Sequence, residues 1–220
     1  MQGAGELEGQ RQVLLLGQPH VVLEQVDGPR LSSLLRRHGR LPEQQYLPLA
    51  IEVAGALHYL RRLGWTHLDI KPSNIIMGAP ARLIDLSVAR PVADAAALTT
   101  EIGTDAYMAP EQCAPGRAGR PGPESDVWGL GATLFEAVTG YRPFDRGDRD
   151  SADPECRYPQ LVEPPYEMPE GTPHEVEKVV FAALEPDPAD RPLPHELAEA
   201  LEPVLARQPK ARFAGFSTAR

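Results

Sequence analysis

Residues 125–139, SDVWGLGATLFEAVT, narrow the choice of fold more than any other segment. The sequence predicts a helix here that ends at Gly140, the residue type that most often follows a helix. The helix is mostly apolar and has no wide polar face, which is typical of a helix surrounded by other elements. The chain is therefore expected to fold around this segment as one domain.

Other helices are predicted by the spacing of their apolar residues. Residues 43–62, EQQYLPLAIEVAGALHYLRR, have the helical period, with Pro42 at the start and Gly64 just past the end. A short helix is expected over residues 31–37, and a last helix over residues 195–206. Another is expected to run to about Leu184 from a capping box at residues 172–175, TPHE. These helices would surround the segment at 125–139.

The strands are expected to be few and short. Residues 12–26, QVLLLGQPHVVLEQV, are typical of two strands joined at a Gly-Gln-Pro break, and residues 74–77 and 82–84 of a hairpin. Residues 91–123 and 145–170 are expected to be irregular. The pattern predicts an α+β fold that is mainly α, without a linker to a second domain.

Composition restricts the partners. The chain has 220 residues and a net charge of −9, which argues against nucleic acid or an anionic membrane as a partner. No apolar run reaches the length of a membrane span, and the acidic N-terminus does not resemble a signal peptide. Cys113 and Cys156 are far apart and lack metal-type spacing, so they are interpreted as free thiols. A cytoplasmic location is expected.

Residues 66–90, THLDIKPSNIIMGAPARLIDLSVAR, carry a set of groups suited to phosphoryl transfer. This chemistry needs a carboxylate for the attacking hydroxyl, hard oxygen ligands for a metal ion, and a cation near the transferred phosphate. Asp69 supplies a carboxylate, Lys71 an ammonium, Asn74 a carboxamide and Asp85 a second carboxylate. The four side chains form a complete minimal set.

The same residues resemble a known family. HLDIKPSN is similar to the H-R-D-x-K-x-x-N catalytic loop of protein kinases, and IDLS to the I-D-F-G that follows it. Lys71, two residues after the aspartate, matches the serine/threonine pattern, so the chain resembles a bacterial Hanks-type kinase. Aminoglycoside phosphotransferases share the loop but lack the lysine, and are the second choice. Four further matches follow in order: PHVVLEQVDG (19–28), GTDAYMAPE (103–111), SDVWGLG (125–131) and DPADRP (187–192).

The resemblance implies a protein-kinase-like fold and ATP and Mg²⁺ as cofactors. Asp69 would be the catalytic base and Lys71 would contact the transferred phosphate. Asn74 and Asp85 would hold Mg²⁺, and Thr104 would steady the catalytic loop and the protein substrate.

Other roles are implied by the same resemblance. Residues Glu24 to Val26 would offer hinge hydrogen bonds to ATP, and Ile76 would form the floor under adenine. Leu23 stands at the gatekeeper position, although core packing explains Ile76 and Leu23 as well as ligand contact does. The residues expected to be structural are His67, Asp126 as a cap on the catalytic loop, and Glu111 paired with Arg191.

Two short departures from the family pattern affect regulation. Leu68 replaces the arginine that reads a phosphate on the activation loop, where Thr99 and Thr100 stand. We therefore expect that phosphorylation of these threonines does not switch activity through this site. Ser87 replaces the glycine after Asp85-Leu86, which reduces the backbone freedom of that turn.

The largest departure concerns the N-lobe. The sequence has no G-x-G-x-x-G loop and no lysine before Lys71, and no C helix with its glutamate is recognised. The expected layout is a disordered lead (1–11), a kinase domain (12–206) and a basic tail (207–220). Within that domain, 12–28 would be remnant N-lobe strands and hinge, and 29–206 the helical C-lobe. Leu23, Val26 and Ile76 would then be exposed as a contact surface for a protein partner.

Two functions remain open from the sequence. The first is a serine/threonine protein kinase that acts on a protein substrate, supported by the complete set from Asp69 to Asp85. The second is a non-catalytic kinase-like interaction module, supported by the missing N-lobe parts and by Leu68.

Overall fold

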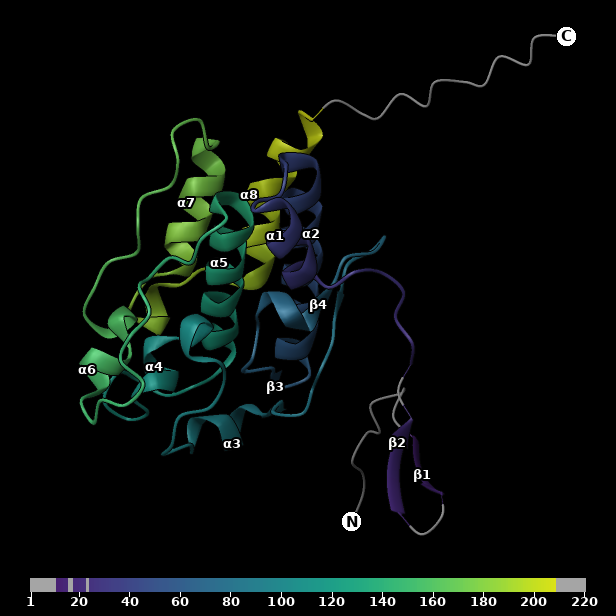
Figure 1. Cartoon of the computed structure of the whole chain (residues 1–220), viewed down its shortest axis with the longest axis vertical. Coiled ribbons are helices and arrows are strands. Elements are labelled where there is room, and N and C mark those ends of the chain that lie inside the picture. The colour runs from purple at the N-terminus through teal and green to yellow at the C-terminus, as the bar shows by residue number, and fades with distance from the viewer. Residues whose placement is uncertain (1–10, 16–17, 23, 209–220) are drawn as a thin grey trace, which may run out of the picture.

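The computed structural model describes residues 11–15, 18–22 and 24–208. It is built mainly of helices, as the coloured elements of Figure 1 show. The helices are α1 (Leu31–His38), α2 (Glu43–Arg62), α3 (Val92–Ala96), α4 (Pro110–Cys113), α5 (Pro123–Thr139), α6 (Pro154–Arg157), α7 (His174–Ala183) and α8 (Pro194–Ala206). The strands are β1 (Arg11–Leu15), β2 (Gln18–Val22), β3 (Trp65–Thr66), β4 (Ile75–Ile76), β5 (Arg82–Leu83) and β6 (Arg90–Pro91).

Helix α5 is the centre of the fold, as its sequence predicts. Trp128 and Phe135 on α5 are almost completely buried, and α2 and α7 both pack against this helix. Helix α8 packs against α2 and α7, so the four helices enclose one apolar core. Gly131 allows the close approach of α7, because a Cβ atom at this position would lie 2.8 Å from the Cβ atom of Ala183. Among the described residues, no helix is long and apolar enough to cross a membrane.

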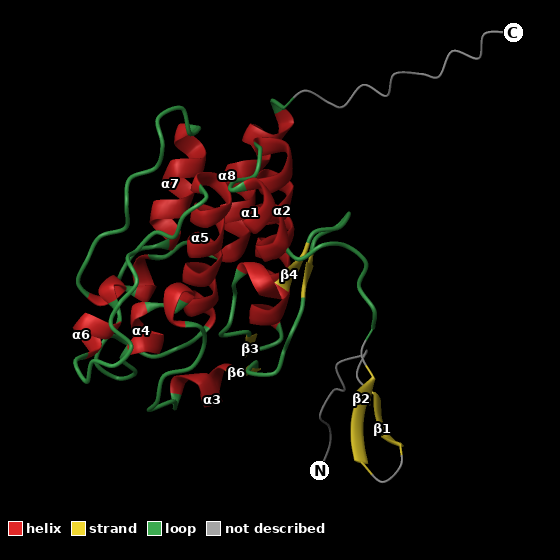
Figure 2. Cartoon of the chain, in the orientation of Figure 1, coloured by secondary structure: helices red, strands yellow, loops and turns green. Residues whose placement is uncertain are grey.

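Within the described part of the chain, the strands form three separate two-stranded antiparallel ladders. β1 pairs with β2, β3 with β6, and β4 with β5 as the predicted hairpin of residues 74–84. Figure 2 shows β1 and β2 apart from the helices, whereas β3 and β4 lie beside them. The predicted Gly-Gln-Pro break is shorter than expected, since Gln18 and Pro19 already belong to β2.

The predicted capping box at residues 172–175 is wrong. Helix α7 begins at His174, and Pro173 occupies the cap position without offering a side-chain acceptor. The hydroxyl of Thr172 donates instead to the carbonyl of Pro169 (2.8 Å), and Glu175 forms an ion pair with Arg207, the residue after α8. The two side chains of the motif therefore bond to other groups rather than to each other's backbone amides.

The two segments predicted to be irregular contain short helices. Helices α3 and α4 lie within residues 91–123, and α6 lies within residues 145–170. Helix α6 is capped by Asp153, whose carboxylate accepts a hydrogen bond from the amide of Glu155 (3.0 Å). Elements of one turn leave no apolar period in a sequence, so they were not predicted.

Candidate active site

The loop of residues 67–74 connects β3 to β4, and α5 holds its first part in place. The buried Asp126 carboxylate of α5 accepts hydrogen bonds from the amides of His67 and Leu68, both at 2.7 Å, and from the Thr66 hydroxyl at 2.8 Å. Burial acts to raise the pKa of Asp126, while these hydrogen bonds act to lower it. The bonds fix the backbone at Leu68, which has a φ of +64° that a residue with a side chain rarely adopts.

A second contact joins α5 to the same loop. Gly129 faces Ile70, and a Cβ atom at Gly129 would lie 2.8 Å from the Cβ of Ile70. Because Gly129 has no side chain, the loop packs directly against the buried helix at Ile70. This contact positions Asp69, which precedes Ile70 in the chain. The loop is thus supported by both a hydrogen-bonded carboxylate and a backbone approach.

Asp69 is the centre of a compact polar cluster. Its Oδ1 atom accepts a hydrogen bond from the Thr104 hydroxyl (2.7 Å), and its Oδ2 atom lies 2.6 Å from the Lys71 ammonium. The amide nitrogen of Asn74 donates to Oδ2 and to the backbone carbonyl of Asp69, at 3.0 and 2.9 Å. Lys71 also donates to Thr104 (2.7 Å), which closes the network. The structure therefore brings together four residues predicted to be functional from two distant segments.

Asp85 lies at the end of the β4–β5 hairpin. The backbone amide of Ile84 donates to the carbonyl of Asn74 (2.9 Å), so the hairpin holds Asp85 beside the loop of residues 67–74. A hydrogen bond from Ser87, partly opposed by desolvation, together with the charge of Lys71, lowers the pKa of Asp85. The carboxylate is therefore ionised at neutral pH. Asp85 also has a positive φ (+69°), a conformation common at functional turns.

The donor chemistry of Asn74 and Asp85 fits Mg²⁺. The nitrogen of the Asn74 carboxamide is used in the bonds to Asp69, which leaves its oxygen as the group available for a cation. The ionised Asp85 carboxylate is a second hard oxygen donor, the class of ligand that Mg²⁺ prefers. Both residues are thus suited to the predicted metal site.

His67 connects the Asp69 cluster to the turn that carries Asp85. Its ring is fully buried, Nδ1 accepts a hydrogen bond from the Asp69 amide (3.3 Å), and Nε2 lies 3.2 Å from the carbonyl of Ile84. If Nδ1 is an acceptor, Nε2 carries the proton and donates to Ile84. The imidazole therefore links the backbone of Asp69 to the backbone of Ile84, the residue before Asp85. This contact agrees with a structural role for His67.

Gln112 is a positioning residue that the sequence reasoning did not identify. Its side-chain nitrogen donates to the carbonyls of Leu68 (2.8 Å) and Ile102 (2.9 Å), so it connects the catalytic loop to the segment that carries Thr104. Gln112 is buried on α4, directly after Glu111. The signal available in the sequence was a polar side chain directly after Glu111, a recognised motif residue.

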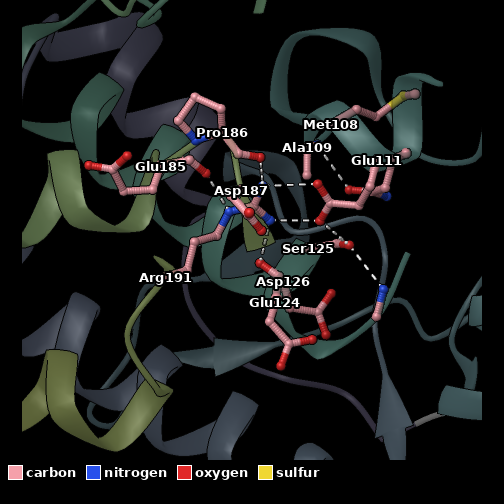
Figure 3. Close-up of polar contacts among 12 residues, drawn as sticks. Met108, Ala109, Glu111, Glu124, Ser125, Asp126, Glu185, Pro186, Asp187 and Arg191 are labelled. Carbon is pink, nitrogen blue, oxygen red and sulfur yellow. Dashed lines mark hydrogen bonds and ion pairs between the residues drawn. The ribbon is translucent and has the colours of Figure 1, made fainter. Parts of the chain in front are cut away.

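Glu111 and Arg191 form a fully buried ion pair beneath α4 and α5. The two guanidinium contacts to the carboxylate are 2.6 and 2.9 Å, and Ser125 donates a further hydrogen bond to Glu111 (2.7 Å). Figure 3 shows Arg191 reaching between Glu111 and the backbone of Glu124, Glu185 and Pro186, whose carbonyls accept its remaining hydrogen bonds. The pair therefore joins the segment before α8 to the segment after Thr104.

The expected open apolar surface on the nucleotide side is wrong at Ile76. Ile76 is only 7% exposed, because the chain from Gly28 to Arg30 crosses it. Arg30 forms a β-bridge with Ile76, and the amide of Met77 donates to the carbonyl of Pro29 (2.8 Å). Ile76 is thus a core residue in this arrangement.

The remaining predicted residues lie outside this cluster. Glu24 is exposed and Val26 is half-buried, whereas the gatekeeper prediction at Leu23 lies outside the described residues. Thr99 and Thr100 are exposed just after α3. The lead and most of the basic tail also lie outside the described residues.

Comparisons with known proteins agree with this geometry. Residues 17–201 match the protein kinase domain family. The chain is 33% identical over 181 residues to the serine/threonine-protein kinase PknB of Mycobacterium leprae, covering 79% of this chain and 28% of that protein. It is 35% identical over 188 residues to PknK of Mycobacterium tuberculosis, covering 82% and 16% respectively. It is also 32% identical over 189 residues to the serine/threonine-protein kinase drp72 of Corynebacterium efficiens, covering 84% and 35%.

The chain spans less than half the length of these relatives. The family match favours the protein kinase interpretation over the aminoglycoside phosphotransferases, which agrees with the lysine at position 71. Catalytic loop, buried helix and family match all lead to the same assignment. The chain belongs to the protein kinase family and is of the Hanks type found in bacterial serine/threonine kinases.

Proposed function

We propose that this chain transfers the γ-phosphoryl group of ATP to a serine or threonine hydroxyl of a protein substrate. The observation that carries the proposal is the cluster at Asp69, where a carboxylate, an ammonium, a carboxamide and a hydroxyl meet within hydrogen-bonding distance. Residues 29–206 would form the catalytic lobe, and residues 12–28 would belong to the N-lobe and hinge.

Asp69 would act on the substrate hydroxyl. Thr104 and Asn74 fix the orientation of its carboxylate, so little reorganisation is needed when a hydroxyl donates its proton. Lys71 lies beside the same carboxylate and can follow the charge that develops on the transferred phosphoryl group.

Asn74 and Asp85 would hold Mg²⁺ against the phosphates of ATP. When bound, Mg²⁺ neutralises phosphate charge during transfer. The lowered pKa of Asp85 keeps its carboxylate charged, so this residue can serve as a ligand throughout the neutral pH range.

The test is a phosphoryl-transfer assay with Mg²⁺ and radiolabelled ATP, comparing the parent protein with an Asp69→Asn variant. We expect at least a hundredfold loss of rate, the lower range for removing a general base. Asp187→Asn is the matched control, because this aspartate only caps a turn through the amide of Ala189. An Asp69→Asn variant that retains its rate contradicts the proposal.

A non-catalytic interaction module is the second candidate. The observation that favours it is the departure from the family motifs at two positions, where Leu68 replaces an arginine and Ser87 replaces a glycine. The same variant separates the two functions: a biological role that survives Asp69→Asn does not depend on catalysis.

A further inference from the structure

We propose that an arginine-lined cavity beside Thr104 binds an acidic side chain of the protein substrate and makes the chain selective for acidic sequences. The inference rests on the proposed function and adds the class of substrate to it. The cavity has a volume of about 270 Å³ and is formed by residues 104–106, 142, 144–147, 149, 157 and 159–160.

The cavity has an excess of positive charge. Four arginines line it, Arg142, Arg146, Arg149 and Arg157, against two aspartates, Asp105 and Asp145. Arg149 is already paired with Asp105 at 3.1 Å. The other three arginines form no ion pair among the described residues of the chain.

Arg157 is the arginine most clearly prepared for a ligand. Its Nε atom is buried and has no hydrogen-bond partner within the part of the chain that the structure describes. Its guanidinium lies 5.0 Å from the centre of the Tyr158 ring, which holds it in place. A buried donor without an acceptor is costly, and a carboxylate that reached it would remove that cost.

The floor of the cavity is rigid. The Gln160 side chain is buried and donates to the carbonyls of Asp105 (2.7 Å) and Met108 (3.1 Å). Arg142 lies over the Tyr107 ring on another wall, 5.5 Å from its centre. Arg142 and Arg157 are therefore held by aromatic rings before a ligand arrives, which lowers the entropy lost on binding.

The cavity is connected to the catalytic cluster. Thr104, which lines it, donates to Asp69 at 2.7 Å. A second cavity of about 440 Å³ shares Thr104 and Arg142 with the first and reaches Lys71. A peptide whose hydroxyl meets Asp69 would therefore place a nearby residue among the arginines.

The acidic character of the whole chain does not oppose this selectivity. The net charge is −9, but charges separated by more than about 8 Å are largely screened at physiological salt. The arginines lining the cavity therefore decide the local preference. Guanidinium groups bind carboxylates through paired, directed hydrogen bonds, so Asp and Glu side chains are the expected ligands.

The first test measures binding without turnover. Two fluorescent peptides with one serine, flanked either by glutamates or by glutamines, are titrated with the full chain and followed by anisotropy. We expect the glutamate peptide to bind about tenfold more tightly, and the Arg157→Gln substitution to remove most of this difference. The control is Arg62→Gln, an exposed arginine on α2, which should retain the selectivity. Thermal unfolding checks that each variant is folded.

Equal binding of the two peptides to the parent chain overturns the inference. It is also overturned if a double variant, Arg146→Gln with Arg157→Gln, still prefers the glutamate peptide. Adding Mg-ATP separates the inference from the proposed function. Selective binding without phosphorylation of either peptide supports the cavity and contradicts the kinase activity, whereas equal phosphorylation and binding of both peptides contradicts the cavity alone.

Discussion

At the scale of single residues, Arg191 shows how much depends on one buried charge. Its side chain is inaccessible to solvent, and Glu111 is its ion-pair partner among the described residues. Replacing Arg191 by leucine would leave the Glu111 carboxylate buried without a counterion. We expect the free energy of unfolding to fall by about 3–5 kcal/mol, the usual cost of breaking a buried ion pair.

Urea unfolding measures this loss. Arg207→Gln removes an arginine from an exposed pair with Glu175 and should leave the midpoint nearly unchanged. Equal midpoints for the two variants would show that the buried pair is dispensable. The sequence alone predicts the Glu111–Arg191 pair from two motifs. It could not predict Ser125 or the three carbonyls around the pair, because their contacts depend on how distant turns meet.

The two cysteines should differ sharply in reactivity. Burial raises the pKa of the Cys113 thiol well above its usual range, and the nearby Glu111 adds to the shift. Cys156 is exposed. Because the thiolate is the reactive form, one thiol should react quickly with a disulfide reagent in the native chain and two in urea.

A pH series and one variant complete this experiment. Raising the pH to about 9 should not bring a second fast thiol, because that value stays below the raised pKa of Cys113. Cys156→Ser should abolish the fast reaction. Two fast thiols in the native chain would mean that Cys113 is not buried as described.

Leu68 leads to a prediction about regulation. Its side chain is apolar and buried, so it offers no positive charge to a phosphate. Its amide donates to Asp126 and its carbonyl accepts from Gln112, which fixes its backbone. Phosphates on Thr99 and Thr100 would lack the usual reader. The Thr99→Ala, Thr100→Ala double variant should therefore change the transfer rate by less than about twofold, or ~0.4 kcal/mol. A large rate loss, measured on the phosphorylated parent and the variant, would contradict this.

At the scale of helices, two glycines should respond in opposite directions to the same substitution. Gly131 on α5 faces α7, and a new Cβ would lie 2.8 Å from Ala183 and 3.3 Å from Leu184. Gly131→Ala should therefore separate the helices and lower the free energy of unfolding by about 1–3 kcal/mol. Gly55 on α2 has open space around it, so Gly55→Ala should raise this free energy by about 0.5–1 kcal/mol. The urea midpoints of the two variants, each compared with the parent chain, test this prediction. A shift of the same sign in both variants would contradict the close packing of α5 against α7.

The helices also show which elements a sequence can specify. α2 has the bounds that its apolar period and flanking residues predict, and it continues through Pro48 because neighbouring helices support it. The capping box before α7 fits its motif equally well but does not form, since α7 begins at His174 and Pro173, rather than Thr172, occupies the cap position. Local patterns predict an element reliably when packing agrees with them. They fail when the helix begins at another residue than the motif indicates.

At the scale of the whole molecule, the site was predicted better than its surroundings. Asp69, Lys71, Asn74 and Thr104 meet as their motifs suggest, because α5 and the β4–β5 hairpin fix the loop from two sides. Ile76 was expected to be exposed on the open face, with core packing as an alternative role, and the structure shows it packed in the core. Its burial depends on the path of the chain from Gly28 to Arg30, and no local pattern encodes where a segment without secondary structure crosses the core.

This arrangement predicts that the helical part folds without the first hairpin. The described core is formed by residues from Leu31 onward, and α2, α5, α7 and α8 contact one another directly. A variant that begins at residue 23 keeps the segment over Ile76 and all of these helices. It should unfold cooperatively in urea at the same midpoint as the full chain, because the buried apolar surface of the helices is unchanged. A lower midpoint, or loss of cooperativity, would mean that β1 and β2 pack on the helices and that the two parts are stable only together.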